Sequence, residues 1–125
     1  MLATTPVIAF VATSDPDRTL RFYRDVLGLR FIADEPHALV FDAGGTMLRI
    51  QKAGGVVVPP YTTLGWRVDD VPATLAALAE RGVAAVRYDF LPQDAQGVWT
   101  TPDGAKIAWF RDPDGHTLSL TSFPR

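Results

Sequence analysis

The feature that most constrains the fold of this 125-residue chain is an internal repeat. The acidic residues Asp15 and Asp70 each precede a proline and an amphipathic segment, and they lie 55 positions apart. The glycines that end the two segments, Gly28 and Gly82, lie 54 positions apart. Aspartate at the N-cap, proline in the first turn and glycine after the last turn are typical of an α-helix. A period of this length indicates two copies of one supersecondary unit.

Strands are expected around both helices, because short apolar runs alternate with turn residues. In the first half these runs are Val7–Ala12, Leu29–Ala33, Leu39–Asp42 and Thr46–Lys52. In the second half they are Tyr61–Val68, Ala84–Tyr88, Gly97–Thr101, Ala105–Phe110 and Thr117–Ser122. The helices present apolar stripes of Leu20, Tyr23, Val26 and Leu27, and of Leu75, Leu78 and Ala79. We therefore interpret residues 1–125 as a single α+β domain. Two tandem βαβββ modules, about 5–53 and about 61–123, are joined by a connector at about 54–60.

Composition excludes several classes of protein. The absence of cysteine removes disulfides, thiol catalysis and zinc–thiolate sites. A net charge of -2 provides no basic excess for nucleic acid. No apolar run approaches the roughly 20 residues that span a bilayer, and the N-terminal residues lack the pattern of a signal peptide. We therefore expect a cytoplasmic protein that binds neither nucleic acid nor membranes.

Alternation along the strands divides the expected sheets into two faces. One face is apolar and carries Leu48, Ile50, Leu64, Trp66, Val68, Leu118 and Leu120. The other face is mixed and carries Met47, Arg49, Gln51, Thr63, Gly65, Arg67, Thr117, Ser119 and Thr121. The apolar face is expected to pack against the helices. Small hydroxyl residues on the mixed face leave room for a ligand, so a binding site is expected there.

Two stretches carry a resemblance to a known family. Residues 15–29 (DPDRTLRFYRDVLGL) and 109–116 (WFRDPDGH) are similar to the two signatures of the vicinal oxygen chelate superfamily, which includes glyoxalases, bleomycin-resistance proteins and extradiol dioxygenases. The resemblance covers essentially the whole chain. It implies a cup-shaped mixed sheet around a ligand cleft and a homodimer.

The resemblance also implies four positions at which enzymes of this family hold a divalent metal. In this chain they are occupied by Ile8, Arg49, Thr63 and Ser119. Isoleucine has no lone pair, arginine is a permanent cation, and lone hydroxyls are weak ligands. We therefore expect no metal and no other cofactor. His37 is expected on the surface and His116 in a structural turn.

Ligand-binding residues are expected on the mixed face and among the aromatic residues. Two interpretations of Arg49 remain open. It is a cationic anchor for a carboxylate, phosphate or carbonyl group, or it has no ligand and either forms a salt bridge to a neighbouring acid or extends to the rim of the sheet. The aromatic residues Tyr61, Trp99 and Trp109 can stack on a planar ligand. Further polar contacts are expected from Gln51, Thr63, Arg67, Ser119 and Thr121.

These observations favour a metal-independent protein that binds a small molecule, with sequestration of an antibiotic or metabolite as its role. The ligand is expected to be planar and aromatic, or anionic. Bleomycin itself is cationic, and a net charge of only -2 disfavours it. The alternative is a lyase, isomerase or dioxygenase-like enzyme of the same fold with an atypical or absent metal site. A third alternative is a protein whose partner surface is its function. No residue is assigned a catalytic role.

Overall fold

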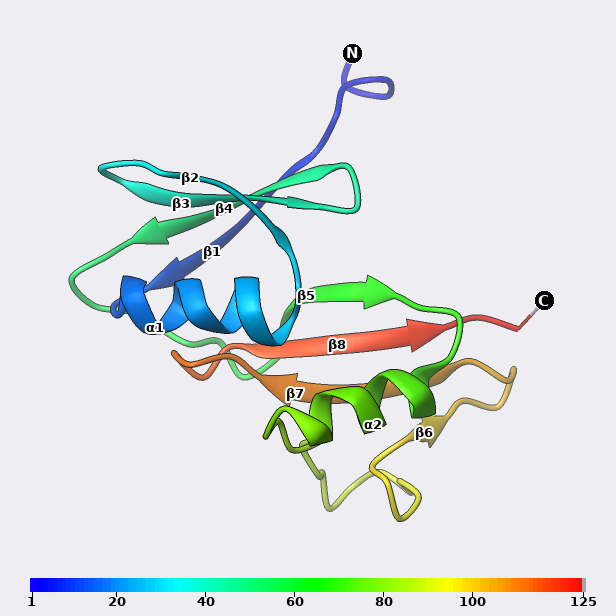
Figure 1. Ribbon diagram of the computed structural model, residues 1–125. Helices are drawn as coiled ribbons and strands as arrows, with labels where there is room; N and C mark the ends of the chain where they lie inside the picture. The colour runs from blue at the N-terminus through cyan, green and yellow to red at the C-terminus, as the bar shows by residue number, and fades with distance from the viewer. Residues whose placement is uncertain (125) are drawn as a thin grey trace. The chain divides into compact units, whose positions relative to one another are not determined.

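The first helix begins as its sequence implies. In the computed structural model, which describes residues 1–124, α1 spans Pro16–Arg21 (Figure 1). The Asp15 carboxylate caps it by accepting the backbone N–H of Arg18 at 3.3 Å. The helix then widens into a π-helical segment, η1 (Phe22–Val26), and Gly28 follows with a φ of 74°. The sequence predicted one continuous helix here, because a single wider turn barely changes the spacing of its apolar residues.

The second helix, α2 (Val71–Glu80), begins at Asp70, whose carboxylate accepts the N–H of Ala73 at 3.0 Å. Its buried residues are Val71, Leu75 and Leu78. The expected stripe was therefore wrong at Ala79, which is exposed. Spacings of four and three residues place Val71 on the face of Leu75 and Leu78 instead.

The first sheet contains four strands, β1 (Ile8–Thr13), β2 (Arg30–Asp34), β3 (Ala38–Ala43) and β4 (Thr46–Lys52). Their order is β1-β4-β3-β2; β1 runs parallel to β4, and the other pairs are antiparallel. Leu48, Ile50 and Phe41 are completely buried, and the ring of Tyr23 lies 6.0 Å from that of Phe41. The core of this unit thus lies between the sheet and η1.

The second sheet repeats this topology with β5 (Thr62–Arg67), β6 (Trp99–Thr100), β7 (Lys106–Arg111) and β8 (Thr117–Ser122). Their order is β5-β8-β7-β6, and again the first and last strands are parallel. Helix α2 packs against β7 and β8. The predicted pair of βαβββ modules is confirmed by these matching sheets.

One predicted strand was wrong. Residues 84–88 form no strand, and only the N–H of Val86 bonds to the edge of the sheet, at the carbonyl of Trp109 (2.8 Å). Instead, the side chain of Gln93 forms hydrogen bonds with the backbone groups of this loop. Its amide nitrogen donates to the carbonyls of Val86 and Gly97, both at 2.9 Å, and its oxygen accepts the N–H of Tyr88 at 2.7 Å. Because these bonds replace sheet bonds, the strand expected at 97–101 is reduced to β6.

The chain divides into two compact units, Met1–Val57 and Val58–Arg125, and the boundary falls inside the expected connector. Across residues 1–124, none of the helices has the length and apolar character needed to cross a membrane.

Candidate functional site

The second sheet places a set of expected ligand-binding residues on one face. Its register aligns Gly65, Ser119 and Trp109 in one row across three strands. The adjacent row contains Arg67, Thr121, Ile107 and Trp99. We call these seven residues the open face. The side chains of the alternating positions, Trp66, Ala108, Phe110, Leu118 and Leu120, point to the opposite, core-facing side of the same strands.

Four aromatic rings follow one another along this face and the loop beside it. The rings of Trp99 and Trp109 are nearly parallel, with centroids 6.3 Å apart and an interplanar angle of 21°. Tyr88 meets Trp109 edge-on at 5.3 Å, and Phe90 lies 5.4 Å from Tyr88. Phe90, at the end of this aromatic row, is 79% exposed. Aromatic surfaces of this kind offer a planar ligand large apolar contacts at little cost in conformational entropy.

A hydrogen bond fixes the orientation of Trp109. Its indole Nε1–H donates to the hydroxyl of Thr62 on β5 at 3.2 Å. The pairing of β5 with β8 is irregular between Thr62 and Leu64, so Thr62 lies opposite Thr117. The hydroxyl of Thr63 instead donates to the carbonyl of Thr117 at 3.3 Å. Sequence analysis selected Thr63 and missed Thr62, because a strand irregularity shifts the alternation by one residue.

The middle of the open face is lined by small residues. A Cβ atom at Gly65 would lie 2.4 Å from Oγ of Ser119, so the serine hydroxyl occupies the space that a side chain would need. At one edge, the guanidinium of Arg67 lies 5.1 Å from the ring centroid of Phe123. This is a cation–π contact, and the register of β5 with β8 places Arg67 beside Thr121.

The loop that carries Tyr88 is held by an aspartate. The carboxylate Oδ1 of Asp94 accepts the backbone N–H groups of Val98, Gln96 and Gly97 at 2.9 to 3.0 Å. These bonds, that of Val98 first, hold the pKa of Asp94 below its ordinary value. The charged form of Asp94 therefore stabilises the loop. Tyr88 was missed as a site residue, because its segment was interpreted as a strand.

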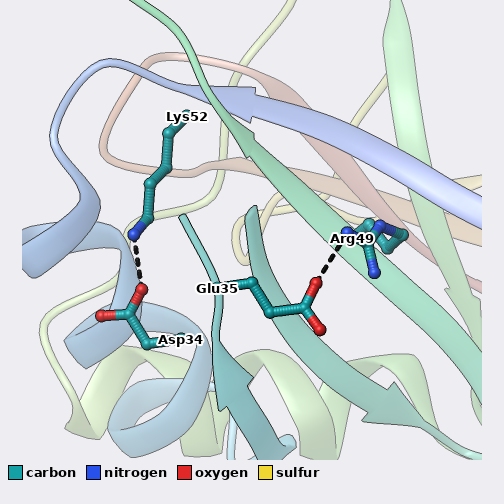
Figure 2. Close-up of polar contacts among 4 residues, drawn as sticks. All are labelled: Asp34, Glu35, Arg49 and Lys52. Atoms are coloured by element: carbon teal, nitrogen blue, oxygen red, sulfur yellow. Dashed lines mark hydrogen bonds and ion pairs between the residues drawn. The ribbon is translucent and has the colours of Figure 1, made fainter. Parts of the chain in front are cut away.

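The remaining predicted residues, Arg49 and Gln51, lie on β4 of the first sheet. Nη2 of Arg49 donates to Oε1 of Glu35 at 2.9 Å, as Figure 2 shows. Lys52 and Asp34 form a second ion pair at 2.5 Å. The salt bridge considered for Arg49 is therefore present, while its role as a ligand anchor stays a prediction. Gln51 is exposed two residues along the same strand.

The four positions at which the resemblance implies metal ligands do not fit a divalent cation. Ile8 has a hydrocarbon side chain, and the guanidinium of Arg49 is a cation already paired with Glu35. The hydroxyl of Thr63 bonds to a main-chain carbonyl, and Ser119 brings no charge to the site. Within residues 1–124, no three His, Cys, Asp or Glu side chains cluster in a way that could hold a metal. No reaction step is therefore derived through a metal.

The two histidines occupy different surroundings. His116 is buried, and its backbone N–H donates to the carboxylate of Asp112 at 2.9 Å. The same carboxylate accepts the N–H of Asp114, and the carbonyl of Asp112 accepts the N–H of Gly115. His116 thus forms part of a structural turn, as expected. His37 is exposed, also as expected.

The fold and the motifs define a known class of protein. The chain belongs to the Glyoxalase/Bleomycin resistance protein/Dioxygenase superfamily, whose family model matches residues 5–120. The resemblance noted from the sequence is thereby confirmed. No curated protein matches the sequence significantly.

Solved structures of this superfamily share the fold over nearly their whole length. A glyoxalase family protein from Enterococcus faecalis aligns with a TM-score of 0.76 and 21% identity, covering 97% of this chain and 99% of its own. Lactoylglutathione lyase from Agrobacterium tumefaciens aligns with a TM-score of 0.75 and 18% identity, covering 96% and 95%. TnmS3, an antibiotic binding protein from Streptomyces sp. CB03234, aligns with a TM-score of 0.72 and 27% identity, covering 99% of each chain.

Proposed function

We propose that this protein binds a small planar aromatic or anionic molecule without a metal or other cofactor, and that it sequesters an antibiotic or a metabolite. The observation that carries the proposal is the aromatic row on the open face, in which Trp109 is oriented by Thr62 and flanked by Trp99 and Tyr88. The similarity to an antibiotic binding protein at 27% identity supports the same function.

The proposed ligand-binding residues are those expected from the sequence, together with two that the structure adds. On the open face and beside it they are Thr63, Arg67, Trp99, Trp109, Ser119 and Thr121, with Thr62 and Tyr88 added. On the first sheet they are Arg49 and Gln51. Rings supply the apolar contact area, and hydroxyl groups supply hydrogen bonds that orient the ligand.

Metal independence is supported by the chemistry of the residues at Ile8, Arg49, Thr63 and Ser119. Metal analysis of protein purified without chelators tests it. We expect no stoichiometric zinc, nickel, iron or manganese. A stoichiometric metal that is lost on Ser119→Ala or Arg49→Ala would contradict the proposal.

We also propose that the protein is a homodimer and acts in the cytoplasm. Apolar side chains are exposed on the first sheet, where Phe10 is 52% exposed, Ile8 46% and Met47 44%. Exposed apolar residues that share one face often mark an interface. Light scattering coupled to size exclusion should give twice the monomer mass for the wild type and the monomer mass for Phe10→Asp. Fractionation of cells that express the protein tests its location.

Thermal denaturation in the presence of planar polycyclic antibiotics tests the binding function. At about a hundredfold excess over Kd, a ligand stabilises the folded state by about 2.7 kcal/mol, and we expect at least one compound to raise Tm by several degrees. Trp109→Ala should abolish the rise, whereas Ile32→Ala, which removes an exposed apolar residue of the first sheet, should retain it. If no compound raises Tm, or if Trp109→Ala responds like the wild type, the proposal is wrong.

A further inference from the structure

The second unit contains an open hollow, and Tyr88 is its only lining residue among the ligand-binding residues proposed so far. Its volume is about 540 Å³, and its lining residues are Val58, Pro59, Pro60, Tyr88, Arg111, Gly115 and Thr117. Sites for small molecules usually have volumes of roughly 300 to 1,000 Å³. We call it the Arg111 hollow.

Arg111 is the last residue of β7 and lies opposite Thr117 of β8. Its side chain is exposed, and it forms no ion pair with any residue between Met1 and Pro124. In the first unit, Arg24, Arg49 and Lys52 are each paired with a carboxylate, whereas Arg18, Arg21 and Arg30 form no ion pair with the described residues, 1–124. A guanidinium without an acidic partner, at the wall of a hollow, can receive a carboxylate through two parallel hydrogen bonds.

The other walls of the hollow suit an aromatic body. Val58, Pro59 and Pro60 offer apolar surface, and Tyr88 presents a ring that also contacts Trp109. Gly115 adds no side chain to the wall, and a Cβ atom placed on it would make only an ordinary contact with Cγ2 of Val58, at 3.9 Å. The Arg111 hollow therefore combines one unpaired cation with apolar walls and adjoins the aromatic row through Tyr88.

We infer that the Arg111 hollow binds a planar aromatic carboxylate, with the carboxylate on Arg111 and the ring system against Tyr88 and the two prolines. This inference rests on the proposed binding function and narrows its ligand class to aromatic acids. Sequence analysis missed Arg111, although the alternation that selects Trp109 on β7 continues to it.

The test is calorimetric titration with two probes of nearly identical shape, 2-naphthoate and its neutral amide, 2-naphthamide. The wild type should bind the carboxylate at least about tenfold more tightly, because a charge-assisted hydrogen bond is far stronger than a neutral one. Arg111→Gln should remove this preference. Arg111→Lys should keep part of it, because charge is retained but the two-pronged geometry is lost. Arg30→Gln, which removes an exposed arginine of the first unit, should leave the affinities for both probes unchanged.

The outcomes separate the inference from the function on which it rests. If both probes bind equally to the wild type and to Arg111→Gln, while Trp109→Ala weakens both, the Arg111 site is wrong and the proposed function stands. If neither probe binds up to its solubility limit, the Arg111 site is wrong, and the thermal-denaturation screen with planar antibiotics decides the proposed function separately. Because Arg111 is exposed, its variants should melt at the wild-type temperature, and this measurement confirms that any loss of binding is local.

Discussion

Arg49 and Glu35 form an ion pair across 2.9 Å, from Nη2 of the guanidinium to Oε1 of the carboxylate (Figure 2). The pair joins β4 to the turn between β2 and β3, and its side chains are 28% and 46% exposed. At such exposure, solvent screening reduces the energy of the pair. Arg49, the cation that sequence analysis selected, is therefore paired within its own unit, whereas Arg111 of the second unit forms no ion pair with any of residues 1–124.

This pair should contribute little to stability. A double-mutant cycle with Arg49→Gln and Glu35→Gln should give a coupling free energy of at most about 1 kcal/mol, measured by urea denaturation. A coupling energy of several kcal/mol would mean that the pair is far less solvated than its exposure indicates.

The contact between Thr13 and Thr19 should contribute more to stability than the ion pair of Arg49 and Glu35. Both threonines are completely buried, and their hydroxyl oxygens lie 2.7 Å apart, joining β1 to α1. Oγ1 of Thr13 also accepts the N–H of Asp15 at 3.1 Å. Thr13→Val should lower the free energy of unfolding by about 1–3 kcal/mol, since it leaves buried polar groups without this hydroxyl. Thr13→Ser keeps the hydroxyl, so its free energy of unfolding should fall by less. Equal decreases in the two variants would show that the hydrogen bond does not stabilise the protein.

Gly97 should be intolerant of a side chain for two reasons. Its φ is 102°, and a Cβ atom there would lie 2.8 Å from Cβ of Ala85. Gly97→Ala should therefore destabilise the protein by about 2 kcal/mol or more. The matched control is Gly44→Ala. Gly44 also has a positive φ, 60°, but a Cβ atom there would meet open space, so the substitution should lower the free energy of unfolding by only about 1 kcal/mol. If the two variants lost the same stability, the close approach of Gly97 to Ala85 would be unimportant.

The charge on Asp94 should make the loop around Tyr88 sensitive to acid. Because hydrogen bonding lowers the pKa of Asp94 in the folded state, the charged form adds stability above the ordinary pKa of 3.8. This contribution is lost as the pH falls below that value and through the lowered folded-state pKa. The difference in Tm between the wild type and Asp94→Asn should thus be constant from pH 8 to about pH 5 and shrink below about pH 4. A difference in Tm that grew as the pH fell would contradict a stabilising role for the charged form of Asp94.

Much of the fold could be predicted from patterns among residues that are close together in the sequence. The caps at Asp15 and Asp70 could be predicted because each depends on a side chain and the backbone three residues away. The faces of β5 and β8 followed from alternation, which holds wherever one side of a sheet is buried: Trp66 stacks on Phe110 in the core, while Gly65 faces Ser119 on the open side.

Other features depend on contacts between distant residues. The strand expected at 84–88 was wrong because the Gln93 side chain bonds to the backbone there, and no propensity of residues 84–88 indicates this. The irregularity that places Thr62 rather than Thr63 near Trp109 arises from pairing with β8. The lack of an acidic partner at Arg111 becomes visible only when its spatial neighbours are known.

The central claim is that a planar ligand binds on the aromatic row of the second sheet. Proton–nitrogen correlation spectra resolve the indole N–H groups of the three tryptophans and report on them during a titration with a planar polycyclic antibiotic that raises Tm. We predict large shifts for Trp99 and Trp109, and little change for Trp66, which stacks on Phe110 on the core side of the sheet. Unmoved signals of Trp99 and Trp109 at saturation, or a shift confined to Trp66, would contradict the account.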